Sequence, residues 1–222
     1  FTHIIERSFF FGAWNEYSEN CWSGASPLRH VVAAAMLGGA ALMSSAGARA
    51  VELAGVQFRQ QVNVAGKPLQ LNGAGVRYKA VFKVYAAGLY VPAKTASATE
   101  AVATDTPKRL SITMLRDIES AELGKMFARG MEENAERGSM VRLLPGIMRM
   151  SQVFSDHKKL KAGESFQVDW VPGPGAVLTI KGQAVGEPFR EPEFFQTLMR
   201  IWLGAKPADW KLKDALLGKE DA

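Results

Sequence analysis

Residues 72–90 read NGAGVRYKAVFKVYAAGLY, a glycine-rich start followed by a run of strand-forming residues. Asn72-Gly73 is a strong hairpin signal, and residues 81–91 are rich in the β-branched and aromatic residues that favour strands. The stretch also holds one arginine, Arg77, and a tyrosine near the centre of the strand, Tyr85. These two side chains are the candidates for the polar end of an otherwise apolar ligand pocket.

Strand and helix patterns continue on both sides of this stretch. Alternation predicts strands over residues 56–64, 69–71, 110–114, 166–170 and 176–181. Three- and four-residue spacing predicts helices over residues 97–103, 120–137, 144–155, 191–203 and 209–217. Strands, then helices, then a hairpin, then helices indicate an α+β fold, in which helices cover one face of an antiparallel sheet. A pocket could lie between the two layers.

Local signals mark several helix ends. Ser97 and Ser120 are predicted to be N-caps, because a serine oxygen can accept from the first free backbone N–H groups. Gly138 is expected to end the second helix in a left-handed conformation. Pro145 is expected in the first turn of the third helix, where proline is tolerated.

Two of the predicted helices carry apolar residues that could form the wall of a pocket. Each has a stripe at helical spacing, which indicates a face turned toward the sheet. The same pattern is typical of ordinary core packing, so both interpretations stay open. The candidate wall residues are Leu123, Met126, Phe127, Phe194 and Leu198.

The first fifty residues differ from the rest of the chain. An apolar run, VVAAAMLGGAALMSS at residues 31–45, follows Arg29 and His30 and precedes Ala48-Arg49-Ala50. This order is typical of a secretory signal peptide over about residues 29–50, and the run is short for a membrane span. We expect cleavage after Ala50 and a periplasmic or secreted domain of residues 51–222. An uncleaved anchor and a buried helix are the alternatives.

Composition excludes several classes of site. The sequence has a net charge of +5, but its basic residues are scattered, which does not favour nucleic-acid binding. After residue 50 there is one histidine, His157, and the only cysteine is Cys21. A His/Cys metal site and a Cys-His or Ser-His pair are therefore not expected, and neither is any cofactor. Gly73-Ala74-Gly75 lacks the third glycine of a dinucleotide motif.

Arg77 and Tyr85 leave two interpretations open. An arginine keeps its charge, so burying one requires a counter-ion. An anionic ligand could serve, with the tyrosine hydroxyl as a second donor and apolar walls that exclude water. The alternative is an internal ion pair with Asp117 or Asp169.

GAGVR at residues 73–77, followed by FKVYAAGLY at residues 82–90, resembles the corresponding stretch of the chalcone isomerase family. The resemblance extends more weakly over most of residues 51–218. It implies an open-faced β-sandwich, a large antiparallel sheet layered with helices. The family includes plant flavonoid enzymes, fatty-acid-binding relatives and exported bacterial chalcone isomerase-like proteins, and the signal peptide places this chain nearest the last group.

The resemblance also implies roles for individual residues. In the enzymes the arginine at the position of Arg77 steadies a phenolate during ring closure, and in the binders an arginine and a tyrosine hold a carboxylate. Tyr85 stands where the enzymes carry threonine and so matches the binders. The enzymes' tyrosine and asparagine fall near Leu123 and Gly130, which cannot polarise a carbonyl.

Three functional hypotheses follow. The first is an exported protein that binds a small amphipathic acid, either a fatty acid or an aromatic acid, with no nucleic-acid partner and no stable membrane span after cleavage. The second is an intramolecular lyase of the chalcone–flavanone isomerase type. The third is a non-enzymatic interaction protein with a degenerate pocket. The first requires a chain reversal between Tyr78 and Phe82, because eight residues of continuous strand span about 26 Å.

Overall fold

The structure is a computed structural model that describes residues 50–219. The predicted signal segment lies outside the described residues, except for Ala50. Within residues 50–219, no helix combines the length and the apolar character that crossing a bilayer requires.

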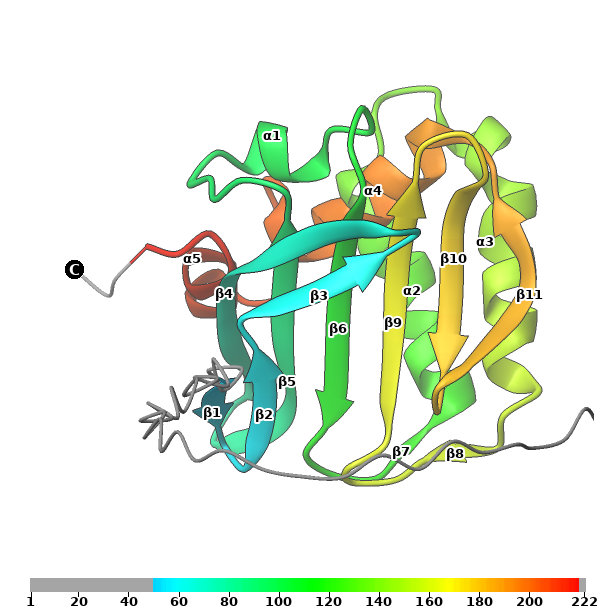
Figure 1. Cartoon of the computed structure of the whole chain (residues 1–222). Helices are drawn as coiled ribbons and strands as arrows, with labels where there is room; N and C mark the ends of the chain where they lie inside the picture. The colour runs from blue at the N-terminus through cyan, green and yellow to red at the C-terminus, as the bar shows by residue number, and fades with distance from the viewer. Residues whose placement is uncertain (1–49, 220–222) are drawn as a thin grey trace, which may run out of the picture. The chain divides into compact units, whose positions relative to one another are not determined.

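A seven-stranded antiparallel sheet forms the centre of the described fold (Figure 1), with strand order β11-β10-β9-β6-β5-β4-β3. Its strands are β3 (Gln61–Val64), β4 (Lys67–Lys79), β5 (Phe82–Val91), β6 (Lys108–Met114), β9 (Ser165–Val171), β10 (Gly175–Ile180) and β11 (Gln183–Phe189). Two short pairs accompany it: β1 (Ala50–Leu53) with β2 (Val56–Arg59), and β7 (Ile118–Glu119) with β8 (Lys159–Leu160).

Helices cover one face of the sheet, and Figure 1 shows α2 and α4 behind its strands and α3 at the side of β10 and β11. The helices are α1 (Ala98–Val102), α2 (Ser120–Asn134), α3 (Met140–Ser155), α4 (Pro192–Leu203) and α5 (Trp210–Leu216). The main hydrophobic core lies between this layer and the sheet. A smaller core on the opposite face packs Phe58 and Val64 against Leu71 and Tyr90. This α+β arrangement is the predicted fold class, which is thereby confirmed.

The predicted hairpin at Asn72-Gly73 is wrong, because β4 continues through this dipeptide to Lys79. The Asn72 side chain instead binds outside the sheet, and its Nδ2 donates to the carbonyl oxygens of Leu216 (2.7 Å) and Thr95 (2.9 Å). Gly73 allows close approach of α5, since a Cβ there would overlap the carbonyl oxygen of Ala215. Asn72 and Gly73 therefore serve the packing of α5 against β4 and do not form a turn.

The chain reverses at Ala80-Val81, a two-residue turn between β4 and β5 in which Ala80 has φ 53°. The reversal expected between Tyr78 and Phe82 is thus confirmed. The sequence carries no glycine at this turn. Ala80 instead adopts the left-handed conformation that usually favours glycine or asparagine.

Helix ends and one strand also depart from the predictions. Ser97 caps α1 as expected, with its Oγ accepting from the N–H of Glu100 (3.3 Å). Ser120 is the first residue of α2 and not its cap, and α2 ends at Asn134, before Gly138. Because α3 begins at Met140, Pro145 lies inside the helix and not in its first turn. Strand β11 was not predicted; Gly186 and a proline interrupt its alternation.

Candidate functional site

Arg77 and Tyr85 lie opposite each other on neighbouring strands. The β4–β5 register pairs Arg77 with Tyr85, one bulge away from the turn. The guanidinium carbon of Arg77 lies 5.7 Å from the centroid of the Tyr85 ring. The two side chains that the sequence separates by eight positions therefore converge.

Both side chains line one cavity of about 340 Å³ between the sheet and the helices. Three of the predicted wall residues, Leu123, Met126 and Phe127, line the same cavity from α2. Ile201 of α4 and the loop that follows that helix close the remaining side. A second cavity of about 280 Å³ adjoins it and shares Arg77, Lys79 and Met126.

The Tyr85 hydroxyl is buried, and its exposed fraction is 2% for the whole residue. It accepts a hydrogen bond from the indole Nε1 of Trp202 (2.8 Å). Burial raises the pKa of Tyr85, and the nearby charge of Arg77 opposes part of that rise. Tyr85 thus stays protonated near neutral pH, and because Trp202 supplies the donor, its own proton remains available to an acceptor in the cavity.

Arg77 is half-buried, and no carboxylate within residues 50–219 forms an ion pair with it. Its Nε is buried, with no hydrogen-bond partner in the part of the chain that the structure describes. No ion pair within residues 50–219 includes it. The two carboxylates proposed as internal partners are engaged elsewhere: Asp117 pairs with Lys159 (3.2 Å), and Asp169 accepts from the Nε of Arg109 (2.6 Å).

Further positive charges surround the cavity. Lys79, Arg129 and Lys206 line it together with Arg77, and the only carboxylate among the lining residues is Glu133. Glu133 already pairs with Arg129 (2.8 Å). The excess of cationic groups favours an anionic occupant. Lys79 and Lys206 could not be predicted from the sequence, because exposed lysines at a strand end and in a loop carry no periodic signal.

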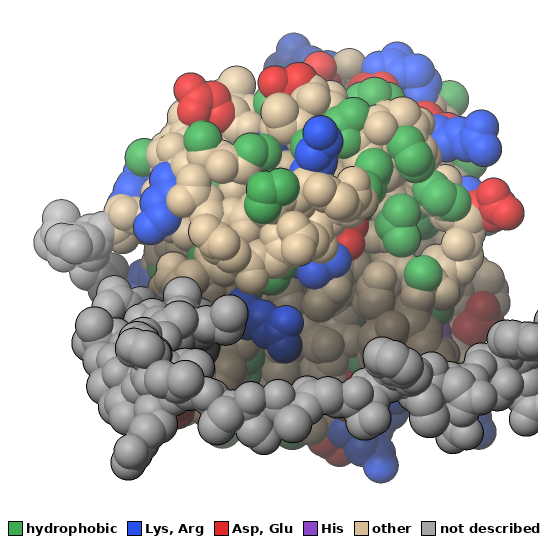
Figure 2. Space-filling model, in the orientation of Figure 1, with side chains coloured by type: hydrophobic (Ala, Val, Ile, Leu, Met, Phe, Trp, Pro, Cys, Tyr) green, Lys and Arg blue, Asp and Glu red, His purple; other side chains and the backbone are tan. Residues whose placement is uncertain are grey.

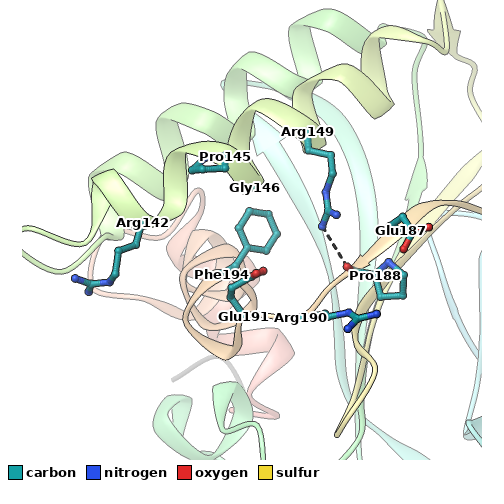
Figure 3. A pocket seen from close by; sticks show the side chains of 9 residues that line it. All are labelled: Arg142, Pro145, Gly146, Arg149, Glu187, Pro188, Arg190, Glu191 and Phe194. Atoms are coloured by element: carbon teal, nitrogen blue, oxygen red, sulfur yellow. Dashed lines mark hydrogen bonds between the residues drawn. The ribbon is translucent and has the colours of Figure 1, made fainter.

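The remaining two wall candidates are not brought to this cavity. Phe194 lines a separate cavity of about 430 Å³ between α3 and β11 (Figure 3), where its ring stacks on Phe189 with centroids 4.4 Å apart. In that cavity Arg149 lies over the Phe189 ring and donates to the carbonyl oxygen of Pro188 (3.2 Å). Leu198 is buried in the main core. Phe194 and Leu198 lie on the buried face of α4, as predicted, but they pack elsewhere in the core and not at the cavity of Arg77.

Basic side chains do not gather on the face that Figure 2 shows, where Lys and Arg are dispersed among polar and apolar groups. Among the described residues, no group of three or more His, Cys, Asp or Glu side chains could hold a metal ion. The side chains around Arg77 offer hydrogen bonds and positive charge beside the apolar residues of α2.

Titration should reveal the buried phenol. We expect Tyr85 to ionise above the ordinary tyrosine pKa of about 10, because the folded protein disfavours the phenolate. The difference between ultraviolet titrations of the wild type and Tyr85→Phe isolates this group. The unfolded chain loses the proton at the ordinary pKa, so the associated stabilisation is complete below about pH 10 and is lost as the pH rises through the folded pKa. If the tyrosine that Tyr85→Phe removes titrates with an ordinary pKa, the burial of Tyr85 is contradicted.

These features define a class: an α+β protein with an antiparallel sheet, a helical layer and a candidate small-molecule cavity between them. A family model described as chalcone isomerase-like matches residues 50–218, and the chain belongs to this family. The family resemblance of residues 73–90 is thus confirmed.

Among solved structures, the fold is similar to that of an Arabidopsis thaliana fatty-acid binding protein. The TM-score is 0.63 at 15% sequence identity, and the match covers 76% of this chain and 96% of that one. At this identity the likeness establishes the fold. A search of curated proteins found no match.

Proposed function

We propose that this protein binds a small amphipathic acid, a fatty acid or an aromatic acid, in the cavity that ends at Arg77 and Tyr85. The observation that carries the proposal is the buried Nε of Arg77, which finds no partner within residues 50–219. A buried polar group without a partner is costly, and a carboxylate would satisfy it through a charge-assisted hydrogen bond. The fatty-acid binding protein of similar fold supports this class of ligand.

The two polar residues divide the recognition of the carboxylate. Arg77 supplies a permanent charge, and Tyr85 supplies a neutral donor whose orientation is fixed by the bond from Trp202. The apolar part of the ligand would lie along Leu123, Met126 and Phe127. A volume of about 340 Å³ lies at the small end of the range of about 300–1,000 Å³ for ligand sites, which favours a small acid.

Binding without turnover is the form we favour. Leu123 and Gly130, the positions near which the resemblance places the enzymes' tyrosine and asparagine, line the cavity and offer no polar side-chain atom. A ring-closing enzyme needs donors where charge develops on the substrate carbonyl. An absorbance assay with chalcones tests the lyase alternative, since ring closure removes the conjugated chromophore; turnover lost in Arg77→Ala would overturn our preference.

The place of action is part of the proposal. We place the domain in the periplasm or outside the cell, after cleavage behind Ala50. The support is the order of charged, apolar and small residues in the sequence before this position. The intact mass of the exported protein measures the cleavage position.

Loss of the charge should abolish most of the affinity. We expect Arg77→Ala to weaken binding of dodecanoic acid by about 10- to 100-fold, since a hydrogen bond to a charged group contributes about 1.5–3 kcal/mol. Calorimetric titration measures the affinity, and native mass spectrometry after gentle purification reports any ligand carried along. Arg142→Ala is the matched control, because Arg142 pairs with Glu193 (2.8 Å) and does not line this cavity. A wild type that neither carries nor binds an acid, or equal occupancy in Arg77→Ala, would refute the proposal.

A further inference from the structure

The turn that joins β4 to β5 exposes apolar side chains. We call residues 78–83, YKAVFK, the hairpin tip. The exposed fractions are 82% for Val81, 62% for Phe82 and 45% for Tyr78. Large apolar side chains at a turn are costly to hydrate, so their exposure at the hairpin tip indicates an interaction surface.

The charge of the hairpin tip is entirely positive. It carries Lys79 and Lys83 and no acidic residue. None of the ion pairs within residues 50–219 involves either lysine. The tip therefore presents aromatic and aliphatic groups flanked by two lysines.

The hairpin tip adjoins the mouth of the candidate cavity. Lys79 lines both adjoining cavities, and the strand register places Phe82 directly opposite it. Residues opposite each other in an antiparallel pair project from the same face, so Phe82 lies on the cavity side of the hairpin.

A second exposed aromatic residue is close in the fold. The N–H of Tyr78 donates to Oδ2 of Asp209 (3.1 Å), which ties the tip to the start of α5. Trp210, the next residue, is 60% exposed, and Nζ of Lys213 lies 4.8 Å from its ring centroid. Tyrosine and tryptophan beside lysine are the residues that favour the interface between lipid headgroups and acyl chains.

We infer that the hairpin tip docks on an anionic phospholipid surface. Inserted apolar side chains and cations that contact anionic headgroups each contribute to interfacial binding. A protein partner is less suited, since a stable interface takes roughly 20–30 residues from each side, whereas the hairpin tip consists of residues 78–83. Docking would bring the cavity mouth to the bilayer surface, where an amphipathic acid partitions. The docking itself does not depend on what the cavity holds.

Helix α3 offers a natural comparison. It exposes Val141 (83%) and Met148 (65%), nearly the same fractions as Val81 and Phe82. However, its neighbouring Arg142 is neutralised by Glu193. In Figure 1 the helix lies on the side of β9–β11, away from β4 and β5, and Val141 and Met148 line neither cavity at Arg77. Exposure alone therefore does not distinguish the hairpin tip from the exposed side of α3, whereas a binding experiment can distinguish them.

A fluorescent probe at each surface provides the test. In the full chain with Cys21→Ser, Val81→Cys or Val141→Cys is labelled with an environment-sensitive fluorophore and mixed with vesicles. The vesicles contain either phosphatidylcholine alone or equal parts of phosphatidylcholine and phosphatidylglycerol. We expect a blue shift for the label at residue 81 with the anionic vesicles, and little shift at residue 141. Because each label reports its own surroundings, anchoring elsewhere in the chain does not mimic this result.

Charge and cavity variants complete the design. Lys83→Ala should raise the vesicle concentration for half-maximal shift about fivefold, whereas Lys67→Ala, at the other end of β4, should not. Arg77→Ala should keep the shift even where it abolishes acid binding, which separates this inference from the proposed function. No shift at residue 81, an equal shift at residue 141, or a shift with equal strength on neutral vesicles would overturn the inference.

Discussion

Gly73→Ala is expected to destabilise the protein by about 3 kcal/mol, because the new methyl group has no room. A Cβ at this position would overlap the carbonyl oxygen of Ala215 and would lie 2.9 Å from that of Leu216. Both are backbone atoms of α5, so no rotamer change relieves the clash. The helix must move away from β4, and the bond from Asn72 Nδ2 to the Leu216 carbonyl (2.7 Å) weakens with it. Urea unfolding followed by circular dichroism measures the loss.

The same substitution elsewhere provides a control with the opposite sign. Gly124 is also buried, but it lies inside α2, and a Cβ there would be 3.6 Å from the nearest atom, the Cα of Ser151. Alanine stabilises a helix interior by roughly 1 kcal/mol relative to glycine. We therefore expect Gly124→Ala to be neutral or stabilising. Equal effects of the two variants would show that close approach of α5 does not explain Gly73.

Phe127→Ala is expected to cost about 3–5 kcal/mol of stability and to enlarge the candidate cavity. The Phe127 ring makes edge-on contacts with Phe154 (5.1 Å), Phe166 (5.6 Å) and Trp202 (5.7 Å between centroids). It also lines the cavity of Arg77. Truncation removes three aromatic contacts and opens the core to the hollow. Thermal and chemical unfolding give the stability, and binding of acids with bulkier apolar groups reports the added volume.

Phe82→Ala is the matched control for this variant. Phe82 is 62% exposed, so its truncation should change the unfolding free energy by no more than about 0.5 kcal/mol. A stability loss of similar size in both variants would place Phe82 in packing and would contradict its exposure. A wild-type stability for Phe127→Ala would contradict the role of this aromatic cluster in the core.

Periodic patterns predicted most of the fold. The alternation in β6 and the stripes of α2 and α4 depend on one buried face, which repeats in the sequence whatever it packs against. Local patterns failed where a distant partner decided the outcome. Asn72-Gly73 looks like a turn because the same residues serve tight turns, but here α5 requires them, and α5 lies more than a hundred residues further along the chain.

The candidate site divides in the same way. The sequence placed Arg77, Tyr85 and the three α2 residues in one motif and one helix face, and the structure brings these five to one cavity. Phe194 and Leu198 share the apolar face of α4 but lie elsewhere in the core. A helix face carries no record of which part of a sheet it covers, so spacing could not exclude them.

By itself, the sequence determined which residues are apolar on one face, where a permanent positive charge lies, and the family to which the chain belongs. Only the tertiary structure decided that Arg77 is half-buried with no counter-ion among residues 50–219, that Trp202 donates to Tyr85, and that Ala80-Val81 forms the turn. The physical reason is that burial, pairing and cavity shape are relations between residues far apart in the chain. Local composition and spacing do not encode those relations.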